Sequence, residues 1–552
     1  MAEGADGRRG GRGADLVSRH RRLTGRTFLV SGLTLVSRIL GLVREILSAA
    51  LFGDKSAVFD AFLTGWRVPN LFRRFLGEGA LSTSFQTEMT RVETEEGEEA
   101  GARLFRETAR VLLGLSIAVT LVVMGAVSVM PDAMPLTGWE WLGADPGYVR
   151  DLTVRVMPFV ILVCLAALAG GALHVRGQFA APAWAPAALN AVWIGILLAL
   201  VAGFGTSPQG EVDDSRHLEM AHWLAWGVLG AGLVQLGVHV PALRAQGLMG
   251  GPKLASSGRG GAWRVIRRSA PLAFGAAVYQ INVMVDGLMA ESLLRDGGPT
   301  AHYYANRIQQ FPMALIAVAA TSAVFPALQA HGARQDRQAV RDLHDRTHRA
   351  VAFVALPASV GLFVLSSSVI EAFFLHGAFT PDGVQRTSSA LRWLCLAILP
   401  AGAAGLVART YYALGDFRTP VQISSGLLVA NALLNWWLVA RAGMDVDGLA
   451  IATAITTWGN LLLLALGLRR HLGLPASTTP LAAPLLLMSV AASACGGAAL
   501  GVQAWLATQA GQAIALPVSI GAGMAVYAWV AHALSVPEAR QAAERLTRRG
   551  RD

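Results

Sequence analysis

Long apolar runs recur along the whole chain and decide what it can fold into. Seven of them are residues 111–130, 158–173, 188–204, 350–365, 426–440, 481–500 and 514–530. Several approach the roughly 20 residues that a helix needs to cross a hydrocarbon core of about 30 Å. Hydrophobic residues make up 53% of the 552 and charged residues only 15%, whereas soluble domains carry about 25% charged residues. The sequence therefore predicts an all-α polytopic membrane protein.

The apolar runs divide the chain into about fourteen transmembrane helices. The expected spans are 27–52, 58–86, 103–130, 148–173, 183–204, 219–243, 266–294, 300–329, 345–368, 385–413, 419–440, 447–468, 480–504 and 513–534. Arginine and lysine are concentrated in every second loop, and loops of that kind face the cytoplasm. The opposite loops hold only Lys55, Arg216, Arg295 and Arg441. Both termini are therefore expected in the cytoplasm.

The basic residues have an explanation in topology. The formal net charge is +10, which in a soluble protein would suggest nucleic acid. Here the positive charges sit mostly in loops between apolar runs, as the positive-inside rule produces, so no nucleic-acid partner is expected. Cys164, Cys395 and Cys495 each lie inside an apolar segment, and we interpret them as small core residues without a disulfide or metal role.

An internal repeat relates the two halves of the chain. Gly-Gln-Phe-Ala-Ala-Pro at 177–182 reappears as Gly-Asp-Phe-Arg-Thr-Pro at 415–420. At nearly the same offset, three upstream residues match three others: Arg67, Ser82 and Phe85 align with Arg307, Ser322 and Phe325. The offset covers six spans, an even number, so the halves are parallel. Transporters handle substrate between such halves.

These observations give a domain organisation. It comprises a disordered basic cytoplasmic tail (1–26), an N-terminal six-helix lobe (27–246), a cytoplasmic linker (247–265), a C-terminal six-helix lobe (266–470), two extra helices (471–534) and a cytoplasmic tail (535–552). Arg21 and Arg22 precede an apolar run as in a twin-arginine signal. That run contains Arg38 and Arg44 and more spans follow, so no cleavage is expected.

Arginines lie inside the first spans, where charged side chains are costly. Arg38 is near the middle of span 27–52, and Arg44 is followed by Glu45. An arginine at the centre of a lipid-exposed helix costs on the order of 2.5–3.5 kcal/mol even on insertion scales. Arg38 is therefore expected to face a protein interior or a watery cavity. For Arg44, pairing with Glu45 or snorkelling to a surface is an alternative.

The second and eighth spans add further charges. These are Arg67, Arg73, Arg74 and Glu78 in span 58–86, and Arg307 in span 300–329. Alone, Arg73 and Arg74 would pass for flanking residues at a cytoplasmic helix end, but beside the arginines of the first span they predict a cationic cavity. Guanidinium groups bind phosphate oxygens bidentately and stay charged at any working pH. The favoured cargo is therefore an anionic, lipid-linked substrate.

A second polar group lies deeper in the chain. Asp286 is a charge inside span 266–294, and Asn431 and Asn435 are four residues apart on one face of span 419–440. One carboxylate with amide oxygens suits a hard cation such as Na⁺. Interhelical hydrogen bonding explains the same residues. Both interpretations stay open from spacing alone. The sequence holds no GxSxG, HExxH or Walker A motif, so no enzyme activity is expected.

Five short motifs carry a family resemblance. They are Ser37-Arg38-Ile-Leu-Gly-Leu-Val-Arg44-Glu45, Phe59-Asp60-Ala-Phe, Pro69-Asn70-Leu-Phe-Arg73-Arg74, Glu78-Gly79-Ala80 and Tyr303-Tyr304-Ala-Asn-Arg307. With these motifs the chain closely resembles the MurJ (MviN) lipid II flippases, members of the multidrug/oligosaccharidyl-lipid/polysaccharide exporter superfamily. The resemblance extends from about residue 27 over essentially the whole chain and includes the number of spans.

The resemblance implies a role in peptidoglycan synthesis. Family members move undecaprenyl-diphosphate-linked disaccharide pentapeptide from the inner to the outer leaflet of the bacterial cytoplasmic membrane by alternating access. The substrate-binding residues that the resemblance implies are Arg38, Arg44, Arg73, Arg74 and Arg307, with Asp60 and Glu78 as acidic family positions. Arg67 joins this set as the repeat partner of Arg307. Lipid II, membrane lipids and the cell-wall synthesis machinery are the implied partners.

Two further expectations rest on the resemblance. The family's two extra C-terminal spans form a groove for the lipid tail, which agrees with the almost charge-free segment 480–534. Some members bind Na⁺ between spans seven, eleven and twelve, and that site resembles Asp286, Asn431, Asn435 and Thr453. No cofactor is expected, with Na⁺ as a candidate coupling ion.

The chain departs from the family pattern at two places. Asn306 and Gln310 stand where some members have acidic residues flanking the span-eight arginine, so acidic partners for a gate at Arg307 are missing. Asn435 stands where one member has aspartate, which removes one negative charge from the ion site. Alternatives are a flippase for another polyprenyl-linked oligosaccharide, a cation-coupled multidrug exporter, and a non-transporting cell-wall scaffold. A scaffold would have no reason to keep arginines within its spans.

Overall fold

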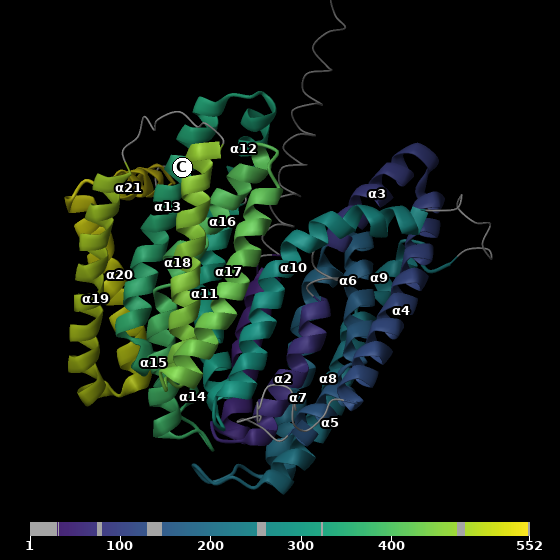
Figure 1. Ribbon diagram of the computed structural model, residues 1–552, viewed down its shortest axis with the longest axis horizontal. Coiled ribbons are helices and arrows are strands. Elements are labelled where there is room, and N and C mark those ends of the chain that lie inside the picture. The colour runs from purple at the N-terminus through teal and green to yellow at the C-terminus, as the bar shows by residue number, and fades with distance from the viewer. Residues whose placement is uncertain are drawn as a thin grey trace, which may run out of the picture.

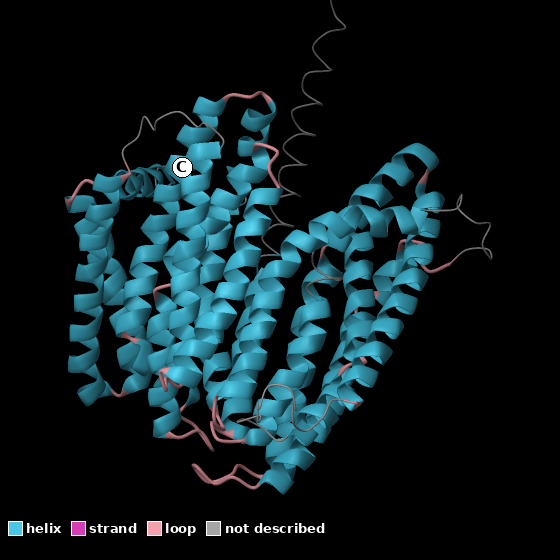
Figure 2. Cartoon of the chain, in the orientation of Figure 1, coloured by secondary structure: helices cyan, strands magenta, loops and turns pink. Residues whose placement is uncertain are grey.

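The computed structural model describes residues 30, 32–73, 80–129, 146–250, 261–321, 324–471 and 481–549, and every regular element within them is helical (Figure 2). The first helix covers residues 32–52. The others are α2 (Ala57–Phe72), α3 (Ala80–Glu96), α4 (Glu98–Ser128), α5 (Pro146–Val156), α6 (Phe159–Val175), α7 (Ala180–Phe204), α8 (Asp214–Gly237), α9 (Val240–Ala245), α10 (Gly261–Leu293), α11 (Gly298–Thr321), α12 (Val324–Ala333), α13 (Arg337–Val364), α14 (Ser366–Phe374), α15 (Pro381–Cys395), α16 (Ile398–Ala413), α17 (Arg418–Trp436) with the π-helical η2 (Trp437–Arg441), α18 (Val446–His471), α19 (Ala482–Ala510), α20 (Gln512–Ala533) and α21 (Pro537–Arg549).

The predicted all-α membrane architecture is confirmed. Each of the fourteen expected spans falls on one helix or on a pair of consecutive helices. Within the described residues, nine helices are long and apolar enough to cross a membrane, and the pair α15 and α16, bent by 40°, is a tenth. Helices α2, α10 and α11, which carry Asp60, Glu291 and Arg307, are not among these ten. The count of fourteen crossings therefore stays a prediction.

Two blocks of helices form the molecule. The first helix, which contacts α2 and α7, forms an N-terminal block with helices α2 to α9, and α11 to α18 form a C-terminal block. Helix α10 packs on α2, α3 and α4 as well as on α11 and α17. The blocks meet near the ends of α2, α5 and α14 and diverge toward α3 and α12 (Figure 1). Helices α19 and α20 pack on each other and on α13, at the outer edge of the C-terminal block.

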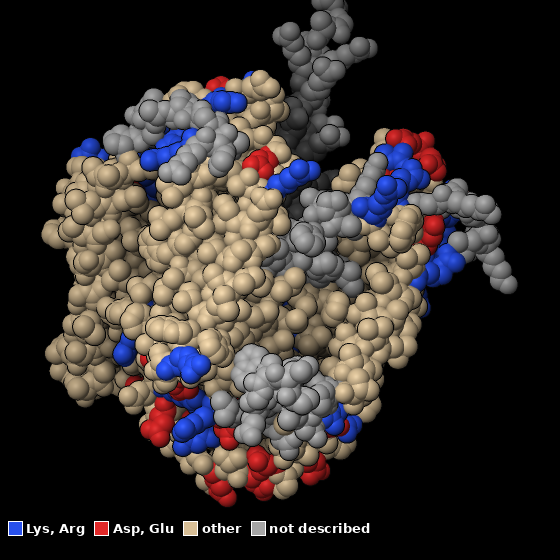
Figure 3. All heavy atoms as spheres, viewed as in Figure 1, with Lys and Arg blue, Asp and Glu red and all other residues tan. Residues whose placement is uncertain are grey.

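The distribution of charge on the surface fits a membrane-spanning body. On the face shown in Figure 3, acidic and basic residues gather toward the two ends, and the band between them is almost free of charge. Large apolar side chains are exposed on the helices of this body, among them Leu486, Met524 and Trp529 on α19 and α20. Soluble monomers rarely expose so much contiguous apolar surface. The exposed side chains are therefore placed to contact lipid.

The repeated sequence lies where two helices end. Gly177 follows α6 with φ 69° and Gly415 follows α16 with φ 87°. Glycine adopts this left-handed conformation without strain, which is why it so often ends a helix. In both copies the next N–H reaches back to the carbonyl five residues earlier: Gln178 to Leu173 (2.8 Å) and Asp416 to Tyr411 (3.0 Å). The repeated sequence thus builds the same turn twice.

The two blocks are joined by backbone contacts where they meet. The N–H of Ala378 donates to the carbonyl of Ala50 (2.9 Å). Gly53 has φ 72°, and a Cβ there would lie 2.8 Å from the carbonyl oxygen of Ala378, so only glycine permits this approach. Beside it, Asp54 accepts hydrogen bonds from the N–H (2.6 Å) and the hydroxyl (2.8 Å) of Thr380. This end of the molecule is closed.

Candidate functional site

A buried ion pair occupies the first helix. Arg44 and Glu45 are 7% and 3% exposed, and Nη2 of Arg44 lies 2.5 Å from Oε1 of Glu45. Breaking such a pair by removing one partner is costly, because it leaves an uncompensated buried charge. The alternative interpretation of Arg44, pairing with its neighbour, is confirmed.

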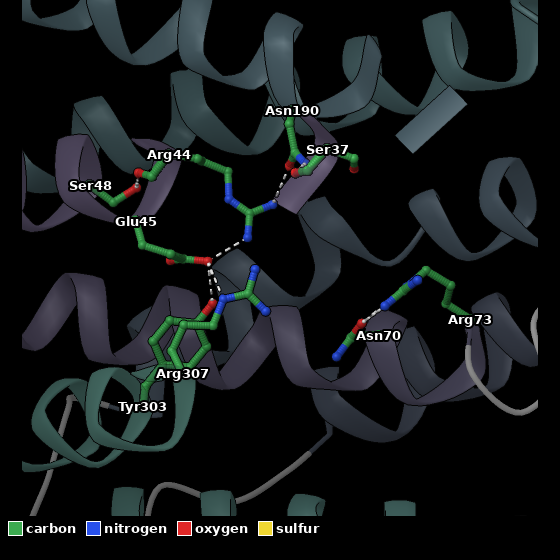
Figure 4. A network of polar contacts seen from close by, with 9 residues as sticks. All are labelled: Ser37, Arg44, Glu45, Ser48, Asn70, Arg73, Asn190, Tyr303 and Arg307. Atoms are coloured by element: carbon green, nitrogen blue, oxygen red, sulfur yellow. Dashed lines mark hydrogen bonds and ion pairs between the residues drawn. The ribbon is translucent and has the colours of Figure 1, made fainter. Parts of the chain in front are cut away.

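Helix α7 fixes the direction of the Arg44 guanidinium. Its Nη1 donates to Oδ1 of Asn190 (3.1 Å), and Nδ2 of Asn190 donates in turn to the carbonyl of Ser37 (3.0 Å). The guanidinium carbon lies 4.5 Å from the ring centroid of Trp193, within the range of a cation–π interaction. The first helix and α7 together therefore hold this cation in one position (Figure 4).

Helix α11 brings a second guanidinium from the other block. Nε of Arg307 lies 3.4 Å from Oε1 of Glu45, and the hydroxyl of Tyr303 donates to the same oxygen (3.0 Å). A Cβ at Gly41 would lie 3.3 Å from Nη2 of Arg307, so the guanidinium reaches close to the backbone of the first helix. One carboxylate thus joins both blocks of the molecule (Figure 4).

The charges of this cluster do not balance. Within the described residues, the two guanidinium groups of Arg44 and Arg307 face the single carboxylate of Glu45. One positive charge is left over, and it belongs to the more accessible group, because the Arg307 side chain is 31% exposed. Six residues before Arg44, Arg38 is exposed and has no hydrogen-bond or ion-pair partner in the part of the chain described. Both guanidinium groups therefore keep N–H donors that take no partner within the described residues.

Arg73 lies apart from this cluster. Nε and Nη2 of Arg73, at the end of α2, donate to Oδ1 of Asn70 (3.1 and 2.9 Å). In Figure 4 this pair is separate from the ion pairs around Glu45. Arg74 and Glu78 lie outside the described residues. The structure therefore brings together Arg44 and Arg307, and it does not join Arg73 to them.

Asp60 lies in a setting different from the one its place in the substrate-binding set predicts. It is fully buried and accepts hydrogen bonds from the N–H of Gly297 (2.6 Å) and from the N–H (2.8 Å) and hydroxyl (2.5 Å) of Thr300. These N–H groups belong to the N-terminus of α11, which favours a carboxylate. Asp60 therefore joins α2 to α11 at the closed end and does not contact the arginines of the cluster.

Replacing Asp60 with asparagine is expected to loosen the closed end. An amide turns one acceptor into a donor that faces N–H groups, and hydrogen bonds to charged groups contribute about 1.5–3 kcal/mol. The closed population should fall about tenfold or more. Cross-linking of cysteines at positions 55 and 382 by a bifunctional maleimide reports it, because Nζ of Lys55 lies 4.0 Å from Oδ2 of Asp382 across this end.

Asp213→Asn is the matched control for that variant. Asp213 caps α8 by accepting from the N–H groups of Ser215 and Arg216 (both 3.1 Å), inside one block. It should leave the rate of cross-linking unchanged. Equal rates in Asp60→Asn and the unmodified chain would show that this carboxylate does not hold the blocks together.

The structure brings the predicted ion-site residues together, except that Thr456 stands in place of Thr453. Nδ2 of Asn431 and Nδ2 of Asn435 donate to Oδ1 of Asp286 (2.5 and 2.8 Å). Thr456 donates to Oδ1 of Asn431 (3.0 Å), whereas Thr453 donates to the carbonyl of Leu449 in its own helix. The interhelical hydrogen bonding that was the alternative interpretation is confirmed. Thr456 takes the place expected of Thr453.

This group of residues fits Na⁺ poorly. The two amides turn N–H groups, not oxygens, toward the Asp286 carboxylate. Oδ1 of Asn435 is buried and has no hydrogen-bond partner in the described chain. Turning that amide over would place two oxygens against each other, which is unfavourable unless a cation lies between them. No transport step is assigned to Na⁺ here.

Besides Thr456, four residues of these sites were not predicted from the sequence. Asn190, Trp193 and Tyr303 hold the arginine cluster, and Glu291 is fully buried in α10. Tyr303 stands in a motif that the resemblance included, and Glu291 is a charge inside an expected span, so both carried a signal. Asn190 and Trp193 lie in an apolar segment whose partner is 146 residues away, and periodicity carries no information on that distance.

Comparisons with known proteins agree with this arrangement. A family model described as lipid II flippase MurJ matches residues 48–520. The probable lipid II flippase MurJ of Vibrio cholerae is 30% identical over 460 residues, covering 82% of this chain and 84% of that protein. The lipid II flippase MurJ of Burkholderia cenocepacia is 29% identical over 446 residues, covering 80% and 83%.

Solved structures show the same fold. A lipid II flippase MurJ in an inward closed conformation superimposes with a TM-score of 0.69 at 20% identity, covering 91% of this chain and 98% of that one. An inward-facing transporter of the multidrug resistance MATE family of the MOP superfamily gives 0.63 at 11% identity, covering 82% and 99%. The match of the family model over most of the sequence shows that the chain belongs to the lipid II flippase MurJ family.

Proposed function

We propose that this chain is a lipid II flippase. It moves undecaprenyl-diphosphate-linked peptidoglycan precursor from the inner to the outer leaflet of the bacterial inner membrane by alternating access between its two blocks. The observation that carries the proposal is the surplus guanidinium charge at Glu45, which α11 and the first helix supply from opposite blocks. Family membership points to the same substrate.

The diphosphate is the group that this cluster recognises. An incoming phosphate oxygen competes with Glu45 for Arg307, whose guanidinium keeps N–H donors beyond its ion pair with the carboxylate. Arg38, on the first helix, is exposed and adds a second cation to that of Arg307. Since Arg44 stays fixed by Asn190 and Trp193, the pair Arg44 and Glu45 is the fixed part of the site, and Arg307 and Arg38 are the parts that bind.

Loading takes place from the cytoplasm. The blocks diverge toward α3 and α12 (Figure 1). The arginine excess lies at that end and includes Arg334, before α13, and Arg337 and Arg346 in the first part of α13. By the positive-inside rule this end and both termini are cytoplasmic. The lipid tail stays in the bilayer along α19 and α20. The protein transports its substrate and does not transform it chemically, and the enzymes of cell-wall synthesis are its partners on either side.

Reconstituted flipping tests the proposal. Proteoliposomes with fluorescent lipid II are compared with proteoliposomes that hold another polyprenyl-diphosphate oligosaccharide, and transfer to the other leaflet is measured with an impermeant quencher. We expect lipid II to cross faster. Equal transfer of both lipids would assign the chain to polyprenyl-diphosphates in general, and transfer of neither would contradict a flippase function.

A further inference from the structure

A buried carboxylate joins α10 to α2 outside the arginine cluster. Glu291 is fully buried in α10, and its Oε2 accepts a hydrogen bond from the hydroxyl of Thr64 (2.6 Å). Thr64 lies one helical turn after Asp60 and three residues before Arg67 on α2. Residues at this spacing share one face of a helix. The face of α2 toward α10 is therefore polar through much of its length.

Arg67 lies directly against the backbone of α10. A Cβ at Gly287 would be 2.1 Å from Nη1 and 2.6 Å from Cδ of Arg67, so the guanidinium occupies space that every other residue would fill. Gly287 stands between the two carboxylates of this helix, Asp286 and Glu291. Nη1 of Arg67 is buried and makes no hydrogen bond within the described residues. Among the carboxylates, its charge interacts most strongly with Glu291, then with Asp60 and then with Asp286.

The hydrogen-bond partners of the neighbouring Asp286 are all amide N–H donors. Oδ1 accepts from the amides of Asn431 and Asn435, and Oδ2 has Nδ2 of Asn282 at 3.4 Å. Every one of these is an N–H donor. The nearby positive charge that interacts with this carboxylate belongs to Arg67. A metal ion at Oδ1 would have to displace two amide donors and lie near a guanidinium of the same sign.

We propose that Arg67 is the built-in counter-cation of Asp286 and Glu291, so that this chain binds no alkali cation at Asp286. A guanidinium from α2 supplies the positive charge that a bound Na⁺ would otherwise supply. Gly287 is the position that makes room for it. Because Arg67 and the carboxylates belong to different helices, the counter-charge is supplied by packing of α2 on α10 and does not depend on the ions of the medium.

Thermal unfolding of the purified full-length protein in detergent tests this directly. Tm is compared in 150 mM NaCl and in 150 mM choline chloride, so that ionic strength is constant. Ligands that bind the folded state raise Tm. The unmodified chain should show a sodium-specific shift below about 1 °C. A rise of several degrees that Asp286→Asn removes would overturn the proposal.

Variants at Arg67 supply the converse result. In Arg67→Gln the carboxylates lose their counter-charge, so Tm should fall in choline chloride and NaCl should restore several degrees of it. Arg67→Lys keeps the charge and should remain insensitive to sodium. Gly287→Ala pushes the guanidinium away without deleting it. This variant replaces Arg67→Gln in the sodium comparison if Arg67→Gln does not fold. Absence of a sodium effect in both Arg67→Gln and Gly287→Ala would contradict the proposal.

A transport measurement adds a second readout that rests on the proposed function. Flipping of lipid II by the unmodified chain should change less than twofold when Na⁺ is replaced by choline. The thermal experiment needs no lipid II, so it stands even if the chain flips another lipid. A tenfold loss of flipping without Na⁺ would overturn the role of Arg67 as counter-cation, but it would not contradict lipid II as the substrate.

Discussion

Arg307→Ala is expected to reduce lipid II flipping by at least about tenfold and to abolish growth of a strain that depends on this chain. The variant removes the half-exposed guanidinium that carries the surplus charge of the cluster, and a charge-assisted hydrogen bond contributes about 1.5–3 kcal/mol. Arg307→Lys keeps the charge but loses the bidentate geometry. Its flipping rate should therefore lie between those of the unmodified chain and Arg307→Ala. The flipping rate is measured in proteoliposomes and growth is measured by complementation, for both variants.

Arg392→Ala is the matched control for that experiment. Arg392 lies in the same block on α15 and donates to the hydroxyls of Ser366 and Ser367 (3.0 and 2.7 Å), away from Glu45. It should flip lipid II at the native rate. If Arg307→Ala flips as fast as this control, the guanidinium of α11 does not bind the substrate.

Glu45→Gln is expected to destabilise the protein by about 3–5 kcal/mol. The variant leaves the buried Arg44 without its carboxylate and leaves Arg44 and Arg307 to repel each other without a shared counter-charge. Removing one partner of a buried ion pair has this cost. Equilibrium unfolding in mixed micelles measures it. The double variant Arg44→Gln/Glu45→Gln removes both charges and should recover part of the loss.

An exposed ion pair provides the comparison for Glu45. Glu95 pairs with Arg91 on α3 at the surface, where its side chain is 53% exposed, and exposed pairs contribute about 0–1 kcal/mol. Glu95→Gln should therefore change the free energy of unfolding by less than about 1 kcal/mol. A similar small change in Glu45→Gln would mean that the Arg44 guanidinium finds another partner or leaves the interior.

The sequence predicted the helices and the repeat well because both rest on local patterns. Apolar runs of fixed length define spans, and Gly177 and Gly415 end helices through their own backbone conformation. The intramembrane arginines were also found, because a charged residue inside an apolar run can be recognised from the sequence alone. What each arginine does was not visible, because it depends on the helix that packs beside it.

Arg67 and Arg307 illustrate that limit. They occupy matching places in the two halves of the repeat, yet Arg307 shares a carboxylate with Arg44 and Arg67 lies against Gly287 between two carboxylates of α10. The repeat predicted similar roles. Different neighbours gave one a binding position and the other a buried counter-charge. The exchange of Thr453 for Thr456 has the same origin, since a shift of three residues along α18 depends on how that helix docks on α17.

The most direct test of the flippase function is the leaflet in which lipid II accumulates. Cells that depend on this chain are depleted of it, and lipid II is probed from outside with an impermeant enzyme or label. Externally accessible lipid II should fall while the total rises, and a plasmid encoding the unmodified chain should restore access, whereas one encoding Arg307→Ala should not. Unchanged access after depletion, with no other flippase acting in the strain, would contradict the flippase function.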